Sequence, residues 1–165
     1  MTLNNYWTIA PKWLKSTLPL LLAAANLLTA QGNILTVATP PKLLAKKNTT
    51  VTAKIGVQLR NGFHVNSNTP ADDYLIPLRL TWSAAPLEMK GVAYPKPKME
   101  KYDFSEKPLS VFSGDFEVTT TFQVPASAAP GMQVISGKLR YQACTHKECF
   151  PPKTVEVKLP VDVVN

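Results

Sequence analysis

Apolar and polar side chains alternate with a period of two along much of the chain. The clearest stretch is 51–60, and the same pattern recurs at 78–83, 116–124 and 154–163. Successive side chains of a β-strand point to opposite faces, so each stretch is predicted to be a strand with one buried and one wet face. No comparable 3.6-residue periodicity appears after residue 31.

Short turn signals separate these stretches. They are Asn61-Gly62, Asn68-Thr69-Pro70, Ala85-Pro86, Ser113-Gly114 and Pro130-Gly131. Six to eight short strands at this spacing predict an all-β fold, an immunoglobulin-like antiparallel β-sandwich, with a barrel as the alternative. The content of 15 prolines against 7 glycines also favours short strands with stiff connections over a helical bundle. Without an internal repeat or a linker, residues 31–165 are expected to form one domain.

The first 30 residues have the organisation of an export signal. Lys12 and Lys15 form a basic start, and the leucine-rich stretch Ser16–Ala30 carries no charge. These fifteen residues are fewer than the roughly 20 that span a bilayer as a helix. A signal peptide at 1–30, cleaved after Ala30 or alternatively Ala25, is therefore favoured over an uncleaved anchor. We expect a periplasmic or otherwise exported protein whose mature chain is not stably inserted in a membrane.

The charge pattern excludes several classes of function. The formal net charge is +7, and the basic residues are scattered rather than gathered into a stripe with aromatic residues. Nucleic-acid binding is therefore not expected, and a mildly basic surface explains the charge. The sequence has no Ser/His/Asp arrangement, glycine-rich phosphate loop or paired-carboxylate signature, so hydrolytic chemistry, nucleotide chemistry and a bound cofactor are not expected.

One segment, Pro95–Pro108, does not follow the strand pattern. It holds three prolines, four lysines and three acidic residues, together with Tyr102 and Phe104. Irregular connections longer than about 12 residues are uncommon and often functional. The two aromatic residues either cover an apolar or reactive group or pin the loop to the edge of the sandwich, and the local sequence leaves both readings open.

The strongest chemical feature is a pair of cysteines between two predicted strands. Cys144 and Cys149 lie between the strands 134–143 and 154–163, and four residues separate them, which suits a hairpin loop. Facing residues of antiparallel strands have Cα atoms roughly 4.5–5.5 Å apart, within the range that a disulfide needs. An exported protein meets oxidising conditions, so the two cysteines are predicted to form an unstrained disulfide.

The alternation along the incoming strand predicts which way the first cysteine faces. Ala143 belongs to the apolar face, whereas Gln142 and Cys144 share the polar face. Cys144 is therefore expected where the thiol of a partner can reach it. Cys149 cannot be placed in this way, because two prolines follow it closely and interrupt the register.

These residues alone do not decide whether the disulfide is static or reactive. Most disulfides in secreted domains are static, yet so small a ring adds only roughly 2 kcal/mol of stability. His146 and Lys147 inside the loop favour a thiolate, while Glu148 opposes it. Both readings stay open at this point.

A metal site is the third possibility. Its ligands would be Cys144, His146, Cys149 and His64, but the chain has only two cysteines and two histidines in total. A closed zinc site needs four ligands, and His64 is remote in sequence, so it is expected to be a satisfied edge residue and no metal is expected. Trp82 is expected in the core, since it lies on an apolar strand face.

Two segments resemble a known family. The run Tyr141-Gln142-Ala143-Cys144, followed by Cys149-Phe150-Pro151-Pro152-Lys153, is similar to the amino-terminal periplasmic domain of the thiol:disulfide interchange protein DsbD. The segment 61–70, with Tyr74-Leu75-Ile76-Pro77 after it, also resembles that family. The likeness covers roughly residues 34 to 163; its cysteine motif is fairly specific, and its strands are not.

The resemblance implies a function. That domain is an immunoglobulin-like sandwich that takes electrons from a thioredoxin-like donor and passes them to exported disulfide oxidoreductases. By resemblance, Cys144 and Cys149 cycle between dithiol and disulfide, and Cys149 forms the mixed disulfide with a partner. Phe104, or alternatively Tyr102, matches an aromatic residue that caps the pair, and Tyr141 and His146 are the expected modulating residues.

The sequence also departs from the family. The best-known members have one more residue between the cysteines. The sequence holds one sandwich, with no polytopic membrane segment and no thioredoxin-like region, so we expect its electron donor to be a separate protein. A non-catalytic binding module with a static disulfide, of adhesin-like or chaperone-like kind, remains the alternative function.

Overall fold

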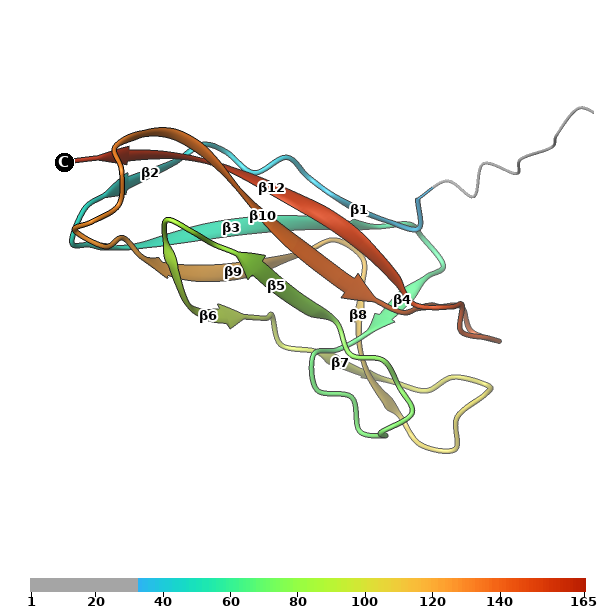
Figure 1. The fold of residues 1–165 in the computed structure, drawn as a ribbon. Helices are drawn as coiled ribbons and strands as arrows, with labels where there is room; N and C mark the ends of the chain where they lie inside the picture. The colour runs from blue at the N-terminus through green and yellow to red at the C-terminus, as the bar shows by residue number, and fades with distance from the viewer. Residues whose placement is uncertain (1–32) are drawn as a thin grey trace, which may run out of the picture. The chain divides into compact units, whose positions relative to one another are not determined.

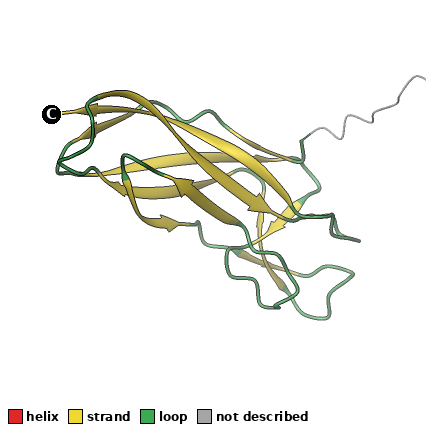
Figure 2. Cartoon of the chain, viewed as in Figure 1, coloured by secondary structure: helices red, strands yellow, loops and turns green. Residues whose placement is uncertain are grey.

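The computed structural model describes residues 33–165, which consist of strands, turns and loops without a helix. The predicted signal peptide at 1–30 lies outside the described residues. Two four-stranded sheets form a sandwich (Figures 1 and 2). The first has the order β1 (Leu35–Val37), β3 (Thr50–Leu59), β9 (Phe116–Gln123) and β6 (Glu88–Ala93). The second has the order β2 (Leu43–Lys46), β12 (Lys153–Val164), β10 (Gly131–Tyr141) and β5 (Arg79–Ser83).

The predicted strands are confirmed in β3, β5, β9 and β12, each within one or two residues of its expected bounds. Neighbouring strands pair antiparallel except β2 and β12, which are parallel. The longest ladder joins β10 to β12 from Gly131↔Val163 to Tyr141↔Lys153. These pairings confirm the immunoglobulin-like antiparallel sandwich that the alternation predicted.

The inward-facing residues of both sheets form one core. In β3 the buried residues are Ala53, Ile55, Val57 and Leu59, which is the face that the alternation assigned to the interior. Trp82 is half-buried, packs its ring edge-on against Phe122 and donates from Nε1 to Oγ1 of Thr120, which confirms its expected place in the core. The ring also lies so close over Gly137 that a Cβ there would be 2.9 Å from it.

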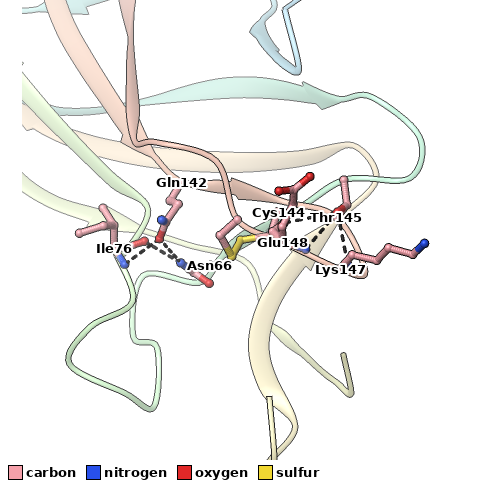
Figure 3. The surroundings of a disulfide bond; sticks show 8 residues. Asn66, Ile76, Gln142, Cys144, Thr145, Lys147 and Glu148 are labelled. Carbon is pink, nitrogen blue, oxygen red and sulfur yellow. Dashed lines mark hydrogen bonds between the residues drawn. A yellow bond between two sulfur atoms is a disulfide. The ribbon is translucent and has the colours of Figure 1, made fainter. Parts of the chain in front are cut away.

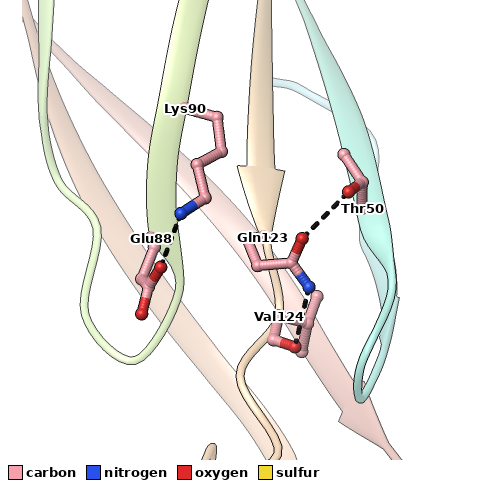
Figure 4. A network of polar contacts seen from close by, with 5 residues as sticks. All are labelled: Thr50, Glu88, Lys90, Gln123 and Val124. Carbon is pink, nitrogen blue, oxygen red and sulfur yellow. Dashed lines mark hydrogen bonds and ion pairs between the residues drawn. The ribbon is translucent and has the colours of Figure 1, made fainter.

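The outer face of the first sheet is wet and polar. Oγ1 of Thr50 donates to Oε1 of Gln123 across the β3–β9 ladder at 3.0 Å, and Nζ of Lys90 pairs with Oε2 of Glu88 at 2.8 Å (Figure 4). These contacts are exposed, and exposed ion pairs add little stability. The core beneath this face, rather than its surface, therefore stabilises the sheet.

A third, smaller sheet extends one end of the sandwich and carries the cysteines. Its order is β11 (Ala143–Cys144), β4 (His64–Asn66), β8 (Leu109–Ser113) and β7 (Lys98–Glu100), all antiparallel. Its strands continue those of the sandwich: β4 follows β3, β11 follows β10, and β8 precedes β9 (Figure 1).

The segment 95–108, predicted as an irregular loop, contains the short strand β7, because its backbone pairs with β8. The part that follows β7, residues 101–108, is a loop and is called the cap loop below. It covers a second apolar cluster formed by Leu75, Tyr102, Leu109 and Val111. Within residues 33–165, no helix has the length and apolar character to cross a membrane.

Candidate redox site

Cys144 and Cys149 form a disulfide at the end of the third sheet, as the sequence predicted (Figure 3). The two residues face each other as an antiparallel bridge, and their Cα atoms are 3.9 Å apart, closer than the separation of roughly 4.5–5.5 Å expected for facing strand residues. The four residues between them, 145–148, are called the cysteine loop below. The disulfide therefore closes a hairpin loop, as its spacing indicated.

Hydrogen bonds on both sides of the bridge hold this hairpin. The amide of Thr145 donates to the carbonyl of Glu148 at 2.8 Å, and the amide of Phe150 donates to the carbonyl of Ala143 at 2.9 Å. Oγ1 of Thr145 also accepts from the amides of Lys147 and Glu148, each at 3.3 Å. Cys144 and Cys149 thus form a non-hydrogen-bonded pair between two backbone hydrogen bonds, the kind of antiparallel pair whose side chains lie closest together.

Hydrogen bonds of the Gln142 side chain, called the polar clamp below, hold the chain in place between β10 and β11. Oε1 of Gln142 accepts from Nδ2 of Asn66 at 3.2 Å and from the amide of Ile76 at 3.3 Å (Figure 3). Nδ2 of Asn66 also donates to the carbonyl of Ile76 at 3.1 Å. Gln142 is the one residue between the two strands, so its side chain ties the start of β11 to β4 and to the loop 67–78.

The two sulfur-bearing residues differ in exposure. Cys144 has 0% of its surface exposed, whereas Cys149 is partly exposed. The expectation that Cys144 lies on an accessible polar side is therefore wrong. The strand alternation stops at Gln142, and β11 pairs with β4 in a different sheet, so the parity of β10 does not extend to Cys144. Between the two residues, Cys149 is the one that solvent reaches.

His64 lies directly opposite Cys144 in the β4–β11 ladder. It is only 3% exposed, and no residue in 33–165 provides a hydrogen-bond partner for its Nε2. Burial lowers the pKa of His64 from 6.5 to about 4, against the opposing charge of Glu100 and with a small contribution from His146. The expectation of a satisfied edge residue is wrong, because the side chain is buried and its Nε2 is not satisfied.

An aromatic residue of the cap loop covers His64. The Tyr102 ring stacks on the imidazole with centroids 3.8 Å apart and planes 13° apart. Its hydroxyl donates to Oε2 of Glu100 at 2.5 Å, and Oγ of Ser113 donates to Oε1 of the same carboxylate at 3.0 Å. The bond from Tyr102 is the largest cause that lowers the pKa of Glu100, while burial raises the pKa of Tyr102.

The cap loop also touches the cysteine loop. The amide of Asp103 donates to the carbonyl of His146 at 3.3 Å, and the His146 ring lies 5.1 Å from that of Tyr102. Phe104 lies farther out, nearly parallel to Tyr102 at 5.7 Å, with 36% of its surface exposed. The two readings of the loop thus both hold for Tyr102, which fills the second apolar cluster and covers His64.

A pocket of about 200 Å³ opens beside these residues. Its wall includes His64, Glu100, Tyr102, His146 and Arg60. The pocket thus brings the cap loop, the cysteine loop and the connection between β3 and β4 to one place.

Of the predicted site residues, the structure gathers Cys144, Cys149, Tyr102, Phe104 and His146 at one end of the molecule. Tyr141 instead packs into the main core, where burial raises its pKa. Its modulating role stays a prediction. Among the described residues, no group of three or more His, Cys, Asp or Glu side chains is arranged to hold a metal ion.

Sequence reasoning assigned no role in this site to Asn66, Glu100 or Gln142, and it considered His64 only as a metal ligand or an edge residue. All four stand in segments that the sequence singled out, at the Asn61-Gly62 turn, in the polar loop or in the cysteine motif. Their roles depend on pairing between strands that are far apart in the chain, so no local pattern marked them.

Comparisons with known proteins agree with this geometry. Residues 33–160 match the family model described as thiol:disulfide interchange protein DsbD, N-terminal. The N-terminal periplasmic domain of ScsB from Proteus mirabilis superposes with a TM-score of 0.55 at 14% identity, over 77% of this chain and 46% of that one. The chain thus spans less than half of that solved protein.

Two further comparisons add nothing to the functional argument. AggA, the major subunit of aggregative adherence fimbriae from Escherichia coli, gives a TM-score of 0.38 at 8% identity, over 79% of this chain and 94% of that one. That similarity is too low to bear on function. A search of curated proteins finds no significant match to the chain.

Proposed function

The chain belongs to the family of N-terminal domains of the thiol:disulfide interchange protein DsbD, and from this premise we propose that it relays reducing equivalents through Cys144 and Cys149 to other exported oxidoreductases. Family membership and the disulfide fit thiol–disulfide exchange. The observation that carries the proposal is the asymmetry of the pair: the partly exposed Cys149 can be attacked, and the buried Cys144 can leave.

The proposed exchange runs in two steps. A thiolate of the donor attacks Sγ of Cys149, the Cys144–Cys149 bond breaks, and the electron pair leaves on Sγ of Cys144, which takes up a proton. The second thiol of the donor then attacks the mixed disulfide, which releases Cys149 as a thiolate and leaves the donor oxidised. The reverse sequence, started by Cys149 on the disulfide of an acceptor, passes the two electrons onward.

The cap loop is proposed to limit access to the pair. Tyr102 is held by its stack on His64 and its bond to Glu100, and the Asp103–His146 bond closes the cap loop over the cysteine loop. Phe104 is only partly supported by neighbours and can move without disturbing the second apolar cluster. We assign the movable cap to Phe104 and its anchor to Tyr102.

The partners follow from the chemistry of the exchange. A thioredoxin-like protein or domain, with two thiols of its own, is the proposed donor, and exported disulfide oxidoreductases are the proposed acceptors. The periplasm is the proposed compartment, since the ScsB domain with the similar fold is periplasmic and the first 30 residues have the pattern of an export signal.

One observation favours a second function. Complete burial of Cys144 also suits a static disulfide in a binding module. The two functions differ in reduction potential, because structural disulfides lie below about −300 mV whereas exchanging ones lie higher.

The experiment is a redox titration of the purified protein. It is equilibrated in graded glutathione buffers, its free thiols are trapped and counted, and its fold is followed by circular dichroism. We expect both thiols to appear together at a potential above about −300 mV with the sandwich intact. A disulfide that stays closed until the protein unfolds would establish the static role.

A further inference from the structure

We propose that Nε2 of His64 accepts a hydrogen bond from the thiol of Cys144 in the reduced protein, so that His64 favours the dithiol over the disulfide. This inference rests on the proposed exchange function and names the residue that sets its equilibrium. Three observations carry it: the pairing of His64 with Cys144, the burial of both residues, and the unsatisfied Nε2.

The first observation is the register. His64 and Cys144 are direct partners in the antiparallel β4–β11 ladder. Directly opposite residues of such a ladder project their side chains to the same face, with Cβ atoms roughly 4.5–5.5 Å apart. The imidazole and the sulfur of Cys144 are thus neighbours on one face of the third sheet. Both residues are buried, and Tyr102 of the cap loop covers the imidazole.

The third observation, after the burial of both residues, is that Nε2 has no partner among residues 33–165 while the disulfide is closed. The atom is buried, and none of the residues 33–165 hydrogen-bonds to it. Tyr102 lies against the face of the imidazole, and its hydroxyl donates a hydrogen bond to Glu100, so it does not hydrogen-bond to Nε2. A sulfur in a disulfide carries no proton, so Cys144 cannot donate a hydrogen bond to Nε2 until the disulfide is reduced. A buried polar atom without a hydrogen bond destabilises the state that contains it.

The protonation state of the imidazole suits an acceptor. Burial lowers the pKa of His64 to about 4, although the carboxylate of Glu100 opposes this effect. The other charged or titratable groups around it are Tyr102 on the cap loop, His146 on the cysteine loop and Arg60 at the pocket wall. At neutral pH the ring is neutral, with one nitrogen that carries a proton and one that accepts.

Reduction supplies the missing donor. When a donor dithiol reduces the bond, two electrons enter the pair, the donor becomes a disulfide, and the buried sulfur of Cys144 takes up one proton. Cys144 is buried, and a buried charge without a partner is costly, so its sulfur is expected as S–H rather than as a thiolate. The new S–H then donates to Nε2. The dithiol state gains a hydrogen bond that the disulfide state does not have, and the equilibrium shifts toward reduction.

The test compares three forms of the protein. His64→Phe keeps an aromatic ring to stack on Tyr102 but removes the acceptor, and His64→Gln keeps a shorter acceptor. In glutathione titrations we expect His64→Phe to favour the disulfide by about tenfold relative to the wild type, equal to a reduction potential about 30 mV lower. His64→Gln should lie between the two. The inference is overturned if the equilibrium constant between dithiol and disulfide in His64→Phe lies within twofold of the wild-type value.

A second measurement needs no substitution of His64. The chain has two histidines, so ¹⁵N spectra of the labelled wild type contain only two imidazoles, and His146→Phe assigns them. We expect the Nε2 resonance of His64 to move upfield on reduction, as an acceptor nitrogen does on gaining a donor. An Nε2 resonance that is the same in both redox states overturns the inference even if His64→Phe does not fold.

The outcomes separate this inference from the proposed function. The role of His64 alone is contradicted if the wild type exchanges disulfides, His64→Phe leaves the potential unchanged, and the Nε2 resonance is the same in both redox states. A wild type whose disulfide cannot be reduced without unfolding contradicts the exchange function, and the role of His64 with it.

Discussion

The ring of Tyr102 lies parallel to the imidazole of His64 with centroids 3.8 Å apart. This contact links two parts of the chain that are 38 residues apart in sequence, the cap loop and the strand that pairs with Cys144. Through it the cap loop is fixed to the wall of the redox site rather than merely lying over it. The predictions below follow from this arrangement.

Removing the outer aromatic residue should open the site. In Phe104→Ala the loop keeps its Tyr102 anchor but loses an aromatic contact worth about 0.5–1.5 kcal/mol, so Cys149 in the reduced protein should react with iodoacetamide roughly 2- to 10-fold faster. Met132→Ala, at an exposed position at the start of β10, is the control and should leave the rate unchanged. Equal rates in all three proteins would contradict the cap assigned to Phe104.

Removing the hydroxyl of Tyr102 should loosen the anchor and raise the pKa of Glu100. The bond from Tyr102 is the largest cause that lowers that pKa, so Tyr102→Phe should bring it toward 4.5. Hydrogen bonds to charged groups contribute about 1.5–3 kcal/mol, and the stability loss should be of that order at pH 7, where the carboxylate is ionised. It should shrink as pH falls through the pKa of Glu100. Carboxyl ¹³C shifts and denaturation curves measure both effects.

His64 should make the protein less stable below pH 6.5. Its pKa is about 4 in the folded state and 6.5 when unfolded, so the unfolded chain binds more protons between these values. The free energy of unfolding should therefore fall as pH drops from 6.5 toward 4, by at most about 3 kcal/mol at 1.36 kcal/mol per pKa unit. Urea denaturation across this range should show a flatter profile in His64→Phe than in the wild type.

Breaking the polar clamp should destabilise the third sheet. In Gln142→Ala the amide of Ile76 and Nδ2 of Asn66 lose an acceptor in a part-buried place, at a cost of about 1–3 kcal/mol. Gln133→Ala is the control. It removes a glutamine of β10 whose hydrogen bond to the carbonyl of Ala129 is exposed, and it should change stability by less than about 0.5 kcal/mol. Similar losses in both variants, measured by thermal denaturation, would show that Gln142 has no special role.

The alternation of side chains determined the sandwich and most of its strands. In β3 every second residue is buried, as the sequence indicated, because strand faces repeat every two residues and the core takes one face. The four-residue spacing of Cys144 and Cys149 likewise determined that they form a hairpin disulfide. Both features depend on residues close together in the chain, where sequence patterns are informative.

Only the tertiary structure decided how the disulfide is surrounded. The exposure of Cys144 could not follow from the parity of β10, because the chain leaves that sheet at Gln142 and pairs with β4 instead. His64 and Glu100 reach the site through strand pairing across tens of residues, and no local pattern encodes such pairing. The sequence therefore determined which two cysteines form the disulfide, and long-range pairing decided which of them is partly exposed and which lies beside the buried imidazole of His64.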